Sequence, residues 1–423
     1  MDKLVCPCIC GRVKGYFQRG KMIDIVKAKE IIDRESEGLC EMDEVSIVDS
    51  LSCVLFHDIY ATTDLPPYDR SAMDGYAVRS EDIEKASEEM PIILNIIDMV
   101  QTGKVSEKEV GNREAIKIMT GGKIPAGADT VVMKEFTEEE GDIVKVYKGV
   151  AKGRNICYRG EDIKEGGIVF KKGFKVTPAV IALCASLGIS RLRVYRKPKV
   201  AILTIGDELL DIDEELKDGK IRDSNKYALI SQLNECGIYP IILERAEDRF
   251  EDIYKKVNEG LNSDFLLTSG GVSVGDFDFV KKVFKEVGIK IFFDKVAIKP
   301  GKPTVFGKKD KTIVFGLPGN PVATMITFYE FVRPVIMRFM GREDLCLKET
   351  EAILDEDITV EPGRMKILRV KTIKRDNQIF VSIPPTHQGS ANLLSLALSD
   401  ALLKIPGDKS EIKKGTKVKI QLL

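Results

Sequence analysis

The chain has 423 residues, 43% of them apolar and 31% charged, which is ordinary for a protein of two to four globular domains. Lysine and arginine number 65 against 66 aspartates and glutamates, which argues against a nucleic-acid binder, because phosphate contacts need a basic surplus. No apolar run approaches the roughly 20 residues of a membrane span, no signal-peptide pattern opens the chain, and nine scattered cysteines suggest no disulfide framework. We therefore expect a soluble, cytoplasmic protein without a membrane or nucleic-acid partner.

The first 21 residues form an N-terminal extension, which we expect to be disordered. Cys6, Cys8 and Cys10 lie in the run CPCIC, and three such thiolates can bind a soft metal. Sites of this kind usually draw ligands from two segments, and no C-x-x-C follows later in the chain. A metal site here therefore stays the less favoured alternative. The two histidines exclude a multi-histidine metal site elsewhere.

Residues 23–33 carry apolar side chains at helical spacing and are followed by a β-like stretch over 44–60. The segment 64–150 is rich in glycine, proline and short β-branched runs, which predicts a β-dominated region with many turns. A helical pattern returns over 177–187.

From residue 198 to 340, short apolar runs alternate with helical stretches, which indicates a doubly wound, mostly parallel sheet covered on both faces. The predicted strands lie at 199–204, 239–243, 264–268 and 312–315, and the predicted helices at 224–236, 249–262, 277–287 and 321–340. Residues 345–423 revert to alternating strands with glycine and proline turns, which predicts a small β domain.

Three unusual loops follow predicted strands of the sheet: 204–209 (TIGDEL), 268–276 (TSGGVSVGD) and 316–321 (GLPGNP). Ligands of open α/β sheets bind outside the carboxyl ends of the strands, where glycines let the backbone approach phosphate groups. Three such loops predict one site, although each loop alone is equally compatible with a simple turn.

The polar residues of these loops are mainly acidic, and they would repel a phosphate unless a hard cation lay between them. Mg²⁺ resolves this conflict, because it binds one or two carboxylates together with phosphate oxygens and water. The candidates are Asp207, Glu208, Asp223, Asp248, Asp276 and Asp278. For Asp248 and Asp278, capping of the following helix is the alternative.

Cations follow in the run KVAIKPGKP, where Lys295, Lys299 and Lys302 project from a proline-rich segment that cannot be helical. This constellation suits a compact oxyanion, and a solvated lysine face is the alternative. In the β-rich region, Asp74 and Thr120 each precede a glycine and are either site residues or turn formers. The chain has neither a G-x-S-x-G elbow nor a P-loop, so metal, carboxylate and lysine chemistry is what remains.

At these residues the sequence resembles the molybdopterin molybdenumtransferases, the MoeA family, which includes the E domain of gephyrin. The resemblance runs from Met22 to Leu423. It is carried by SAMDGYAV (71–78), TGGKIPAGADTVV (120–132), RGEDI (159–163), TIGDEL, IRDSN (221–225), SGGVSVGDFD (269–278), KPGKP and GLPGNP.

The resemblance implies a transferase that inserts molybdate, or tungstate, at the dithiolene of adenylylated molybdopterin and releases AMP. It also implies an elongated homodimer whose site lies where the α/β domain of one subunit meets the β-rich domain of the other. Four domains are expected in the following ranges: a bridging domain (22–60 with 151–190), a β-rich insertion (61–150), an α/β molybdopterin-binding domain (191–342) and a C-terminal β-barrel (343–423).

The family's functional residues are carried over by motif. The pterin would lie on Gly270, Gly271, Ser273, Pro318, Gly319, Asn320 and Pro321, and Mg²⁺ near Asp207 and Glu208, with Asp248 and Asp278 close by. The partner subunit would contribute Asp74, Thr120 and Asp162. Lys295, Lys299 and Lys302 would supply positive charge to the oxyanion, and Arg369 and Ser390 match the oxyanion-binding positions. Glu208 is the candidate to orient or activate the attacking oxygen, and Cys157 stands where the family usually has arginine.

Three other functions compete with this hypothesis. The adenylyltransferase that would make the intermediate, and is a candidate partner, carries a G-G-T-G loop where this chain has Gly-Gly-Val-Ser, and it lacks the β-rich insertion. A receptor-clustering scaffold would need fused partner domains. A nucleotide-binding protein with another substrate is the third.

Overall fold

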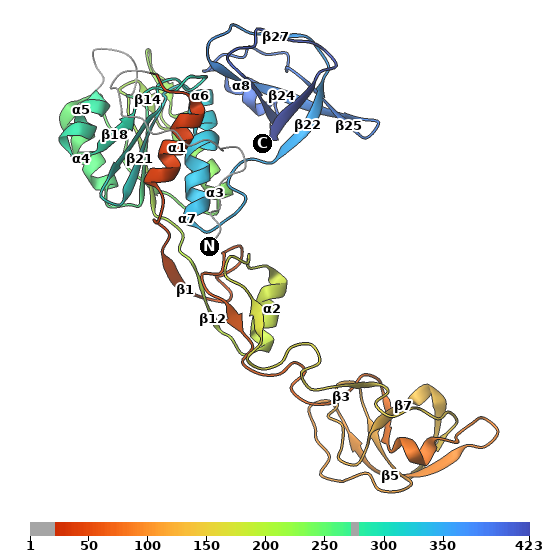
Figure 1. Cartoon of the computed structure of the whole chain (residues 1–423). Coiled ribbons are helices and arrows are strands. Elements are labelled where there is room, and N and C mark those ends of the chain that lie inside the picture. The colour runs from red at the N-terminus through yellow and green to blue at the C-terminus, as the bar shows by residue number, and fades with distance from the viewer. Residues whose placement is uncertain (1–21, 272–278) are drawn as a thin grey trace. The chain divides into compact units, whose positions relative to one another are not determined.

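The computed structural model describes residues 22–271 and 279–423 (Figure 1). Its contacts divide the chain into two compact units, one formed by the residues up to Asp43 with Tyr195–Leu423 and the other by Glu44–Val194. The chain leaves the first unit in β1 (Met42–Ser46) and returns in β12 (Arg191–Tyr195), and these two strands pair.

The first unit contains a six-stranded sheet in the order β16-β13-β17-β21-β20-β18. Its strands are β16 (Ile241–Ile242), β13 (Val200–Thr204), β17 (Phe265–Ser269), β21 (Thr312–Leu317), β20 (Val305–Lys309) and β18 (Lys290–Phe293). The first four run parallel, as the alternating pattern predicts. The last two are antiparallel, and no helix in the sequence separates them to signal a crossover.

Helices cover both faces of this sheet, as expected for a doubly wound fold (Figure 1). One face packs against α1 (Ile25–Glu35), α3 (Ser224–Glu235) and the closing helical segment, and the other against α4 (Phe250–Gly260) and α5 (Phe279–Glu286). Because Ile25, Ala28 and Ile32 are buried in this core, helix α1 packs on the α/β sheet. The finer division of the chain into four domains stays a prediction.

The predicted closing helix over 321–340 consists of three consecutive pieces. These are α6 (Pro321–Thr327), the π-helical turn η3 (Phe328–Val332) and α7 (Arg333–Phe339). The π turn contains Glu330, whose carboxylate is buried between Lys29 of α1 and Lys404 of a C-terminal strand at 2.7 and 2.6 Å.

The C-terminal region forms a closed barrel, because β24 pairs with both β25 and β26. Its strands are β22 (Glu349–Leu354), β24 (Met365–Arg375), β25 (Gln378–Ser382), β26 (Ala401–Ile405) and β28 (Lys417–Leu422). The short ladder β23 (Ile358–Thr359) with β27 (Glu411–Ile412) and helix α8 (Leu393–Ala397) complete it. The start of β24 also pairs with β19 (Ile298–Lys299), which joins the barrel to the α/β part of the same unit.

The second unit is β-rich and is built on a six-stranded sheet in the order β7-β4-β6-β5-β9-β8. Its strands are β4 (Gly75–Val78), β5 (Ile92–Val100), β6 (Glu114–Ile118), β7 (Thr130–Met133), β8 (Thr137–Glu140) and β9 (Ile143–Val146). The unit also contains the short ladders β2 (Ile59–Tyr60) with β11 (Ile168–Phe170) and β3 (Arg70–Ser71) with β10 (Ile156–Cys157). Its helical elements are α2 (Pro178–Ser186) and the turns η1 (Ser80–Ile83) and η2 (Lys134–Phe136). The β-like stretch predicted over 44–60 is strand only at its two ends, since its middle turns back repeatedly. In the part of the chain that the structure describes, every helix is too short or too polar to cross a membrane.

Candidate functional site

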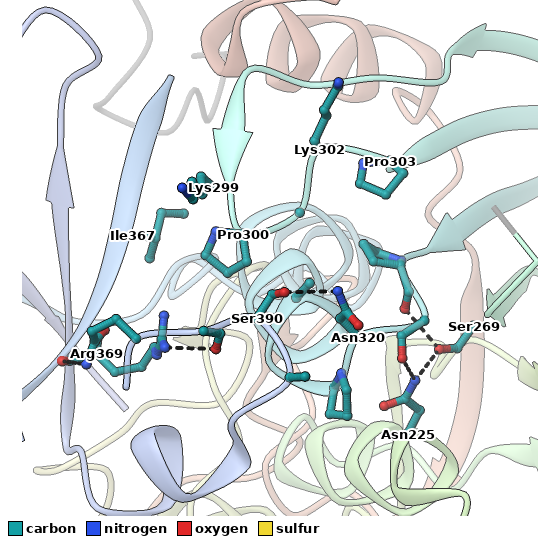
Figure 2. A pocket seen from close by; sticks show the side chains of 18 of the residues that line it. Asn225, Ser269, Lys299, Pro300, Lys302, Pro303, Asn320, Ile367, Arg369 and Ser390 are labelled. Carbon is teal, nitrogen blue, oxygen red and sulfur yellow. Dashed lines mark hydrogen bonds between the residues drawn. The ribbon is translucent and has the colours of Figure 1, made fainter. Parts of the chain in front are cut away.

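A cavity of about 1160 Å³ lies in the first unit, between the carboxyl ends of the parallel strands and the barrel (Figure 2). It is lined by residues of the loops that follow β13, β17 and β21, by Lys299–Pro303, and by barrel residues up to Ala391. Parallel strands end at one edge of a sheet, and ligands of such folds bind there. The structure therefore brings the three glycine-containing loops together around one space.

The floor of the cavity is made of glycines that approach other backbone atoms closely. Gly270 has φ +93°, and a Cβ there would lie 2.2 Å from the carbonyl oxygen of Ile205. Gly271 and the run Pro318–Pro321 also line the cavity. Ser273 and Asp278, both predicted site residues, lie outside the described residues.

Asn225, at the start of α3, holds two of these loops together. Its Nδ2 donates to Ser269 Oγ at 2.9 Å and to the Gly319 carbonyl at 2.8 Å (Figure 2). Asn225 is buried and lines the cavity. Asn225 ends the motif IRDSN, but the sequence alone did not predict a role for it.

Acidic side chains gather at one side of the cavity. Glu208 and Asp248 line it, and Asp207 accepts a hydrogen bond from the Asp248 amide at 2.9 Å. Burial, together with the charges of Asp207 and Glu208, raises the pKa of Asp248 above its ordinary value. Among the described residues, no lysine or arginine forms an ion pair with Asp207, Glu208 or Asp248. No group of three or more His, Cys, Asp or Glu side chains in the described ranges is arranged to bind a metal ion. Asp223 caps α3 by accepting from the Lys226 amide.

Basic residues also line the cavity, and we call them the basic wall. Lys299 and Lys302, both predicted, line it together with Arg364 and Lys366, which were not predicted. Lys295 is not among the lining residues; its carbonyl accepts a hydrogen bond from the Ile23 amide. The cavity therefore carries charges of both signs, and Arg222, Asp357 and Glu361 also line it.

Arg369 and Ser390 lie at the barrel end of the cavity (Figure 2). The Arg369 side chain is fully buried, and it donates to Ser395 Oγ and to the Gly389 carbonyl, both at 3.1 Å. Burial lowers the pKa of Arg369 to about 10, so it remains charged at neutral pH. No carboxylate pairs with it among the described residues, which leaves a buried cation suited to an anionic ligand.

Asp74, Thr120 and Asp162 lie in the second unit and do not line this cavity. The amide and the hydroxyl of Thr120 both donate to Asp74 Oδ1 at 2.8 Å, and these bonds lower the pKa of Asp74. Asp162 is exposed, and its amide bonds to the Leu65 carbonyl. The Asp74 and Thr120 loops therefore form one exposed acidic corner rather than two separate turns.

Comparisons with known proteins agree with this architecture. Three family profiles match: "MoeA N-terminal region (domain I and II)" over 23–188, "Probable molybdopterin binding domain" over 201–338, and "MoeA C-terminal region (domain IV)" over 351–423. The chain is 37% identical over 388 residues to the molybdopterin molybdenumtransferase of Bacillus subtilis, covering 90% of both chains. It is 36% identical over 403 residues to that of Staphylococcus epidermidis, covering 94% and 95%.

Solved structures are similar as well. Two structures of the molybdopterin biosynthesis MoeA protein from Pyrococcus horikoshii match with TM-scores of 0.81 and 0.76. Each is 32% identical and is matched over 95% of this chain and 99% or more of its own. These relatives confirm both the resemblance inferred from the motifs and the predicted multidomain fold of α/β sheet, β-rich region and β-barrel. The chain therefore belongs to the MoeA family of molybdopterin molybdenumtransferases, which are enzymes of molybdenum cofactor biosynthesis.

Proposed function

We propose that this enzyme inserts molybdate at the dithiolene of adenylylated molybdopterin, in a Mg²⁺-dependent reaction that cleaves the phosphoanhydride and releases AMP. One observation carries the proposal: acidic side chains, glycine-containing loops and the basic wall line a single cavity. A phosphoanhydride with a bound cation matches the acidic side chains and the glycines. A tetrahedral oxyanion matches the basic wall.

The adenylylated pterin is assigned to the glycine floor. Gly270 and Gly271 follow β17, and Gly319 lies beside Gly270, so no side chain keeps a phosphate from the backbone there. The cavity, at about 1160 Å³, is larger than the roughly 300–1,000 Å³ of common small-molecule sites. That size suits a ligand made of a pterin and a nucleotide with room for an oxyanion.

Mg²⁺ fits the acidic side. Glu208, Asp248 and Asp207 offer hard oxygen ligands, and among the described residues no lysine or arginine forms an ion pair with them. Burial first, and then the charges of Asp207 and Glu208, raise the pKa of Asp248. Mg²⁺ needs only one or two carboxylates, with phosphate and water completing its shell. When bound, it would neutralise phosphate oxygens and favour departure of AMP.

The protein's own residues would fix the two reactants. Lys299 and Lys302 would bind the oxyanion together with Arg369 and Ser390, and Glu208 would orient the oxygen that attacks the phosphoanhydride. Holding both reactants in one cavity converts a bimolecular exchange into a nearly unimolecular one, and fixed charges stabilise the transition state.

We further propose that the working enzyme is a homodimer in which Asp74, Thr120 and Asp162 of one subunit complete the cavity of the other. The exposed Asp74–Thr120 corner supports this, since it has a fixed polar geometry and lies outside the cavity of the first unit. The enzyme that adenylylates molybdopterin would then be the supplier of the substrate and a candidate partner.

The test mixes purified protein, adenylylated molybdopterin, Mg²⁺ and either molybdate or tungstate, and measures AMP and metallated pterin together. We expect AMP to appear only with an oxyanion and in step with metallated pterin, and the faster oxyanion identifies the metal. Glu208→Gln should abolish most turnover, whereas Glu215→Gln, an exposed charge nearby outside the cavity, should not. Binding of the intermediate without either product would show a carrier instead.

A mixing experiment tests the shared site. Asp74→Asn and Glu208→Gln should each be inactive alone, and equal mixing after subunit exchange should restore about a quarter of wild-type activity, since half of the dimers then hold one intact site. No recovery after verified exchange would place the whole site within one chain.

A further inference from the structure

The basic wall contains a pair of lysines that the sequence does not reveal as a pair. The ladder between β19 and β24 sets Lys299 directly opposite Lys366. The Lys366 side chain is only 10% exposed and lines the cavity, and the Lys299 side chain is 48% exposed. Like charges that face each other across a ladder repel, and an anion between the two lysines relieves this repulsion.

The anion present in the structure is the carboxylate of Glu361. Its Oε2 lies 3.2 Å from Lys299 Nζ and 3.5 Å from Lys366 Nζ. The Glu361 side chain is 82% exposed, in the loop that leads into β24, and both lysines lower the pKa of its carboxyl, Lys299 foremost. Glu361 is therefore ionised at neutral pH, and its exposed side chain can leave for water without a change in the barrel.

The burial of Lys366 is poorly compensated by this contact. An ammonium that is nine-tenths buried needs an ionic or hydrogen-bonding partner, and within the described residues Glu361 is the ionic partner of Lys366, at a distance beyond a good charge-assisted hydrogen bond. One carboxylate also balances only one of two facing lysines. A compact dianion would satisfy both.

We propose that Lys366 is a binding residue of the oxyanion site and that Glu361 occupies this site as an internal carboxylate, which the incoming oxyanion displaces. This inference rests on the proposed function, because that function places the oxyanion beside Lys299. It adds an internal competitor, which balances one of the two lysine charges and weakens the binding of every anion, so that weakly binding anions do not displace it.

Displacement makes a prediction that differs from a mere change of local charge. If Glu361 must leave before any anion binds, its removal tightens the binding of every anion by the same factor. If Glu361 acts only through its field, its removal helps a dianion by the square of the factor for a monoanion, because the interaction scales with ligand charge. Molybdate and perrhenate supply this comparison, since both are tetrahedral and carry two and one charges.

The experiment measures dissociation constants for inorganic molybdate and perrhenate at constant ionic strength and neutral pH, using the full chain. Glu361→Gln should tighten both by the same factor of roughly two to five, the range expected for an exposed ion pair. Glu351→Gln, which removes an exposed charge of β22 outside the cavity, is the control and should change neither. A squared effect on molybdate, or no effect on either, overturns the displacement.

Lys366 is tested by a charge-free variant of similar length and by a conservative one. Lys366→Met should weaken molybdate binding by about tenfold or more, with Lys366→Arg restoring part of it, while an unchanged melting temperature shows that the barrel is intact. Unaltered affinity in Lys366→Met overturns its assignment.

The turnover assay separates this inference from the proposed function. In AMP release, Glu361→Gln should lower the KM for molybdate and leave kcat unchanged. If the anion affinities change as stated but no metallated pterin forms, the oxyanion site stands and the proposed reaction fails. If turnover is normal and KM for molybdate is unaffected by Glu361→Gln, the proposed reaction stands and this inference fails. If the wild type binds neither molybdate nor perrhenate and forms no metallated pterin, both the proposed reaction and this inference are wrong.

Discussion

Asn320 Nδ2 donates to Ser390 Oγ at 2.9 Å, so a loop of the α/β sheet is bonded to a loop of the barrel at the edge of the cavity. The Val322 amide strengthens this connection by donating to the Ser390 carbonyl at 3.1 Å. Because Ser390 Oγ accepts from Asn320, its own hydrogen is directed to another acceptor. On the proposed function, Asn320 is a positioning residue that would present the Ser390 hydroxyl to the oxyanion as a donor.

This relationship predicts the order of two substitutions at one position. Asn320→Ala should raise the KM for molybdate about three- to tenfold, because the hydroxyl loses its orientation. Asn320→Asp should be worse, since a carboxylate takes the hydroxyl hydrogen and repels the oxyanion. Steady-state kinetics of both variants checks the order, and equal effects would show that orientation of Ser390 is unimportant.

Arg369 allows binding and stability to be separated. Arg369→Met should raise the KM for molybdate more than tenfold, because a buried guanidinium is lost. It should change the free energy of unfolding by no more than about 1 kcal/mol, since replacing a buried charge by an apolar chain is often neutral. Arg369→Lys should bind better than Arg369→Met. A large loss of stability in Arg369→Met would make the role of Arg369 structural.

Removal of the Asp248 charge is expected to raise stability and to lower activity. Burial and the charges of Asp207 and Glu208 raise the pKa of Asp248, which means that they destabilise the ionised carboxylate in the folded protein. Asp248→Asn should therefore stabilise the ligand-free protein by a few tenths to about 1 kcal/mol, a modest value because the group is partly exposed. It should also raise the Mg²⁺ concentration needed for half-maximal AMP release. Thermal melting without Mg²⁺ and a Mg²⁺ titration provide the two measurements.

Two neighbouring glycines provide a matched pair. Gly270→Ala places a Cβ 2.2 Å from the Ile205 carbonyl oxygen in a left-handed backbone, and should cost more than about 2 kcal/mol of stability. At Gly319 a Cβ would meet the Gly270 Cα at 3.6 Å, an ordinary contact. Gly319→Ala should therefore fold normally and raise the KM for the pterin substrate. Similar melting temperatures for the two variants would contradict this account.

Glu330 predicts a pH dependence of stability. Burial opposes its ionisation, but the charges and hydrogen bonds of Lys29 and Lys404 outweigh burial and lower the pKa of the carboxyl. A lowered pKa in the folded state stabilises the protein above the ordinary carboxyl pKa, and this contribution is lost as the pH falls through the folded pKa. The wild type should therefore lose more stability between about pH 5 and pH 3 than Glu330→Gln does.

At neutral pH, Glu330→Gln should lower the free energy of unfolding of its unit by roughly 1–3 kcal/mol, because two partly buried lysines lose their counter-ion. Urea unfolding at pH 7 and pH 4 measures both effects. Glu411→Gln, in an exposed pair with Lys413, is the control and should be neutral at pH 7.

The sequence predicted the parallel sheet and its three loops because buried β runs alternate with helical spacing in a simple order. It did not predict β18 and β20 at the sheet edge, because 290–293 and 305–309 lack both a helix between them and a hairpin turn. Asn225 went unassigned since its partners, Ser269 and Gly319, are 44 and 94 residues away.

Lys366 resembles an ordinary outward residue of an alternating strand, and only the pairing of β24 with β19 shows that it is buried. Lys295, four residues before Lys299, stays a prediction as a site residue. Its spacing suggests a shared site, but the chain at that point bonds to Ile23, and Lys295 does not line the cavity. For Asp74, local turn chemistry was one alternative, but its partner is Thr120, 46 residues later.

The strand β24 has a mechanical consequence for access to the cavity. Its first residues are bonded to β19 of the α/β part, while the rest of the same strand closes the barrel against β25 and β26. A swing of the barrel away from the sheet would therefore break backbone hydrogen bonds of a continuous strand and the bond from the Met365 amide to the Ala297 carbonyl. On the proposed function, substrates would then reach the basic wall by diffusion past side chains and loops rather than through a gap between barrel and sheet. Slow amide exchange at Met365 during turnover would be the signature of this access.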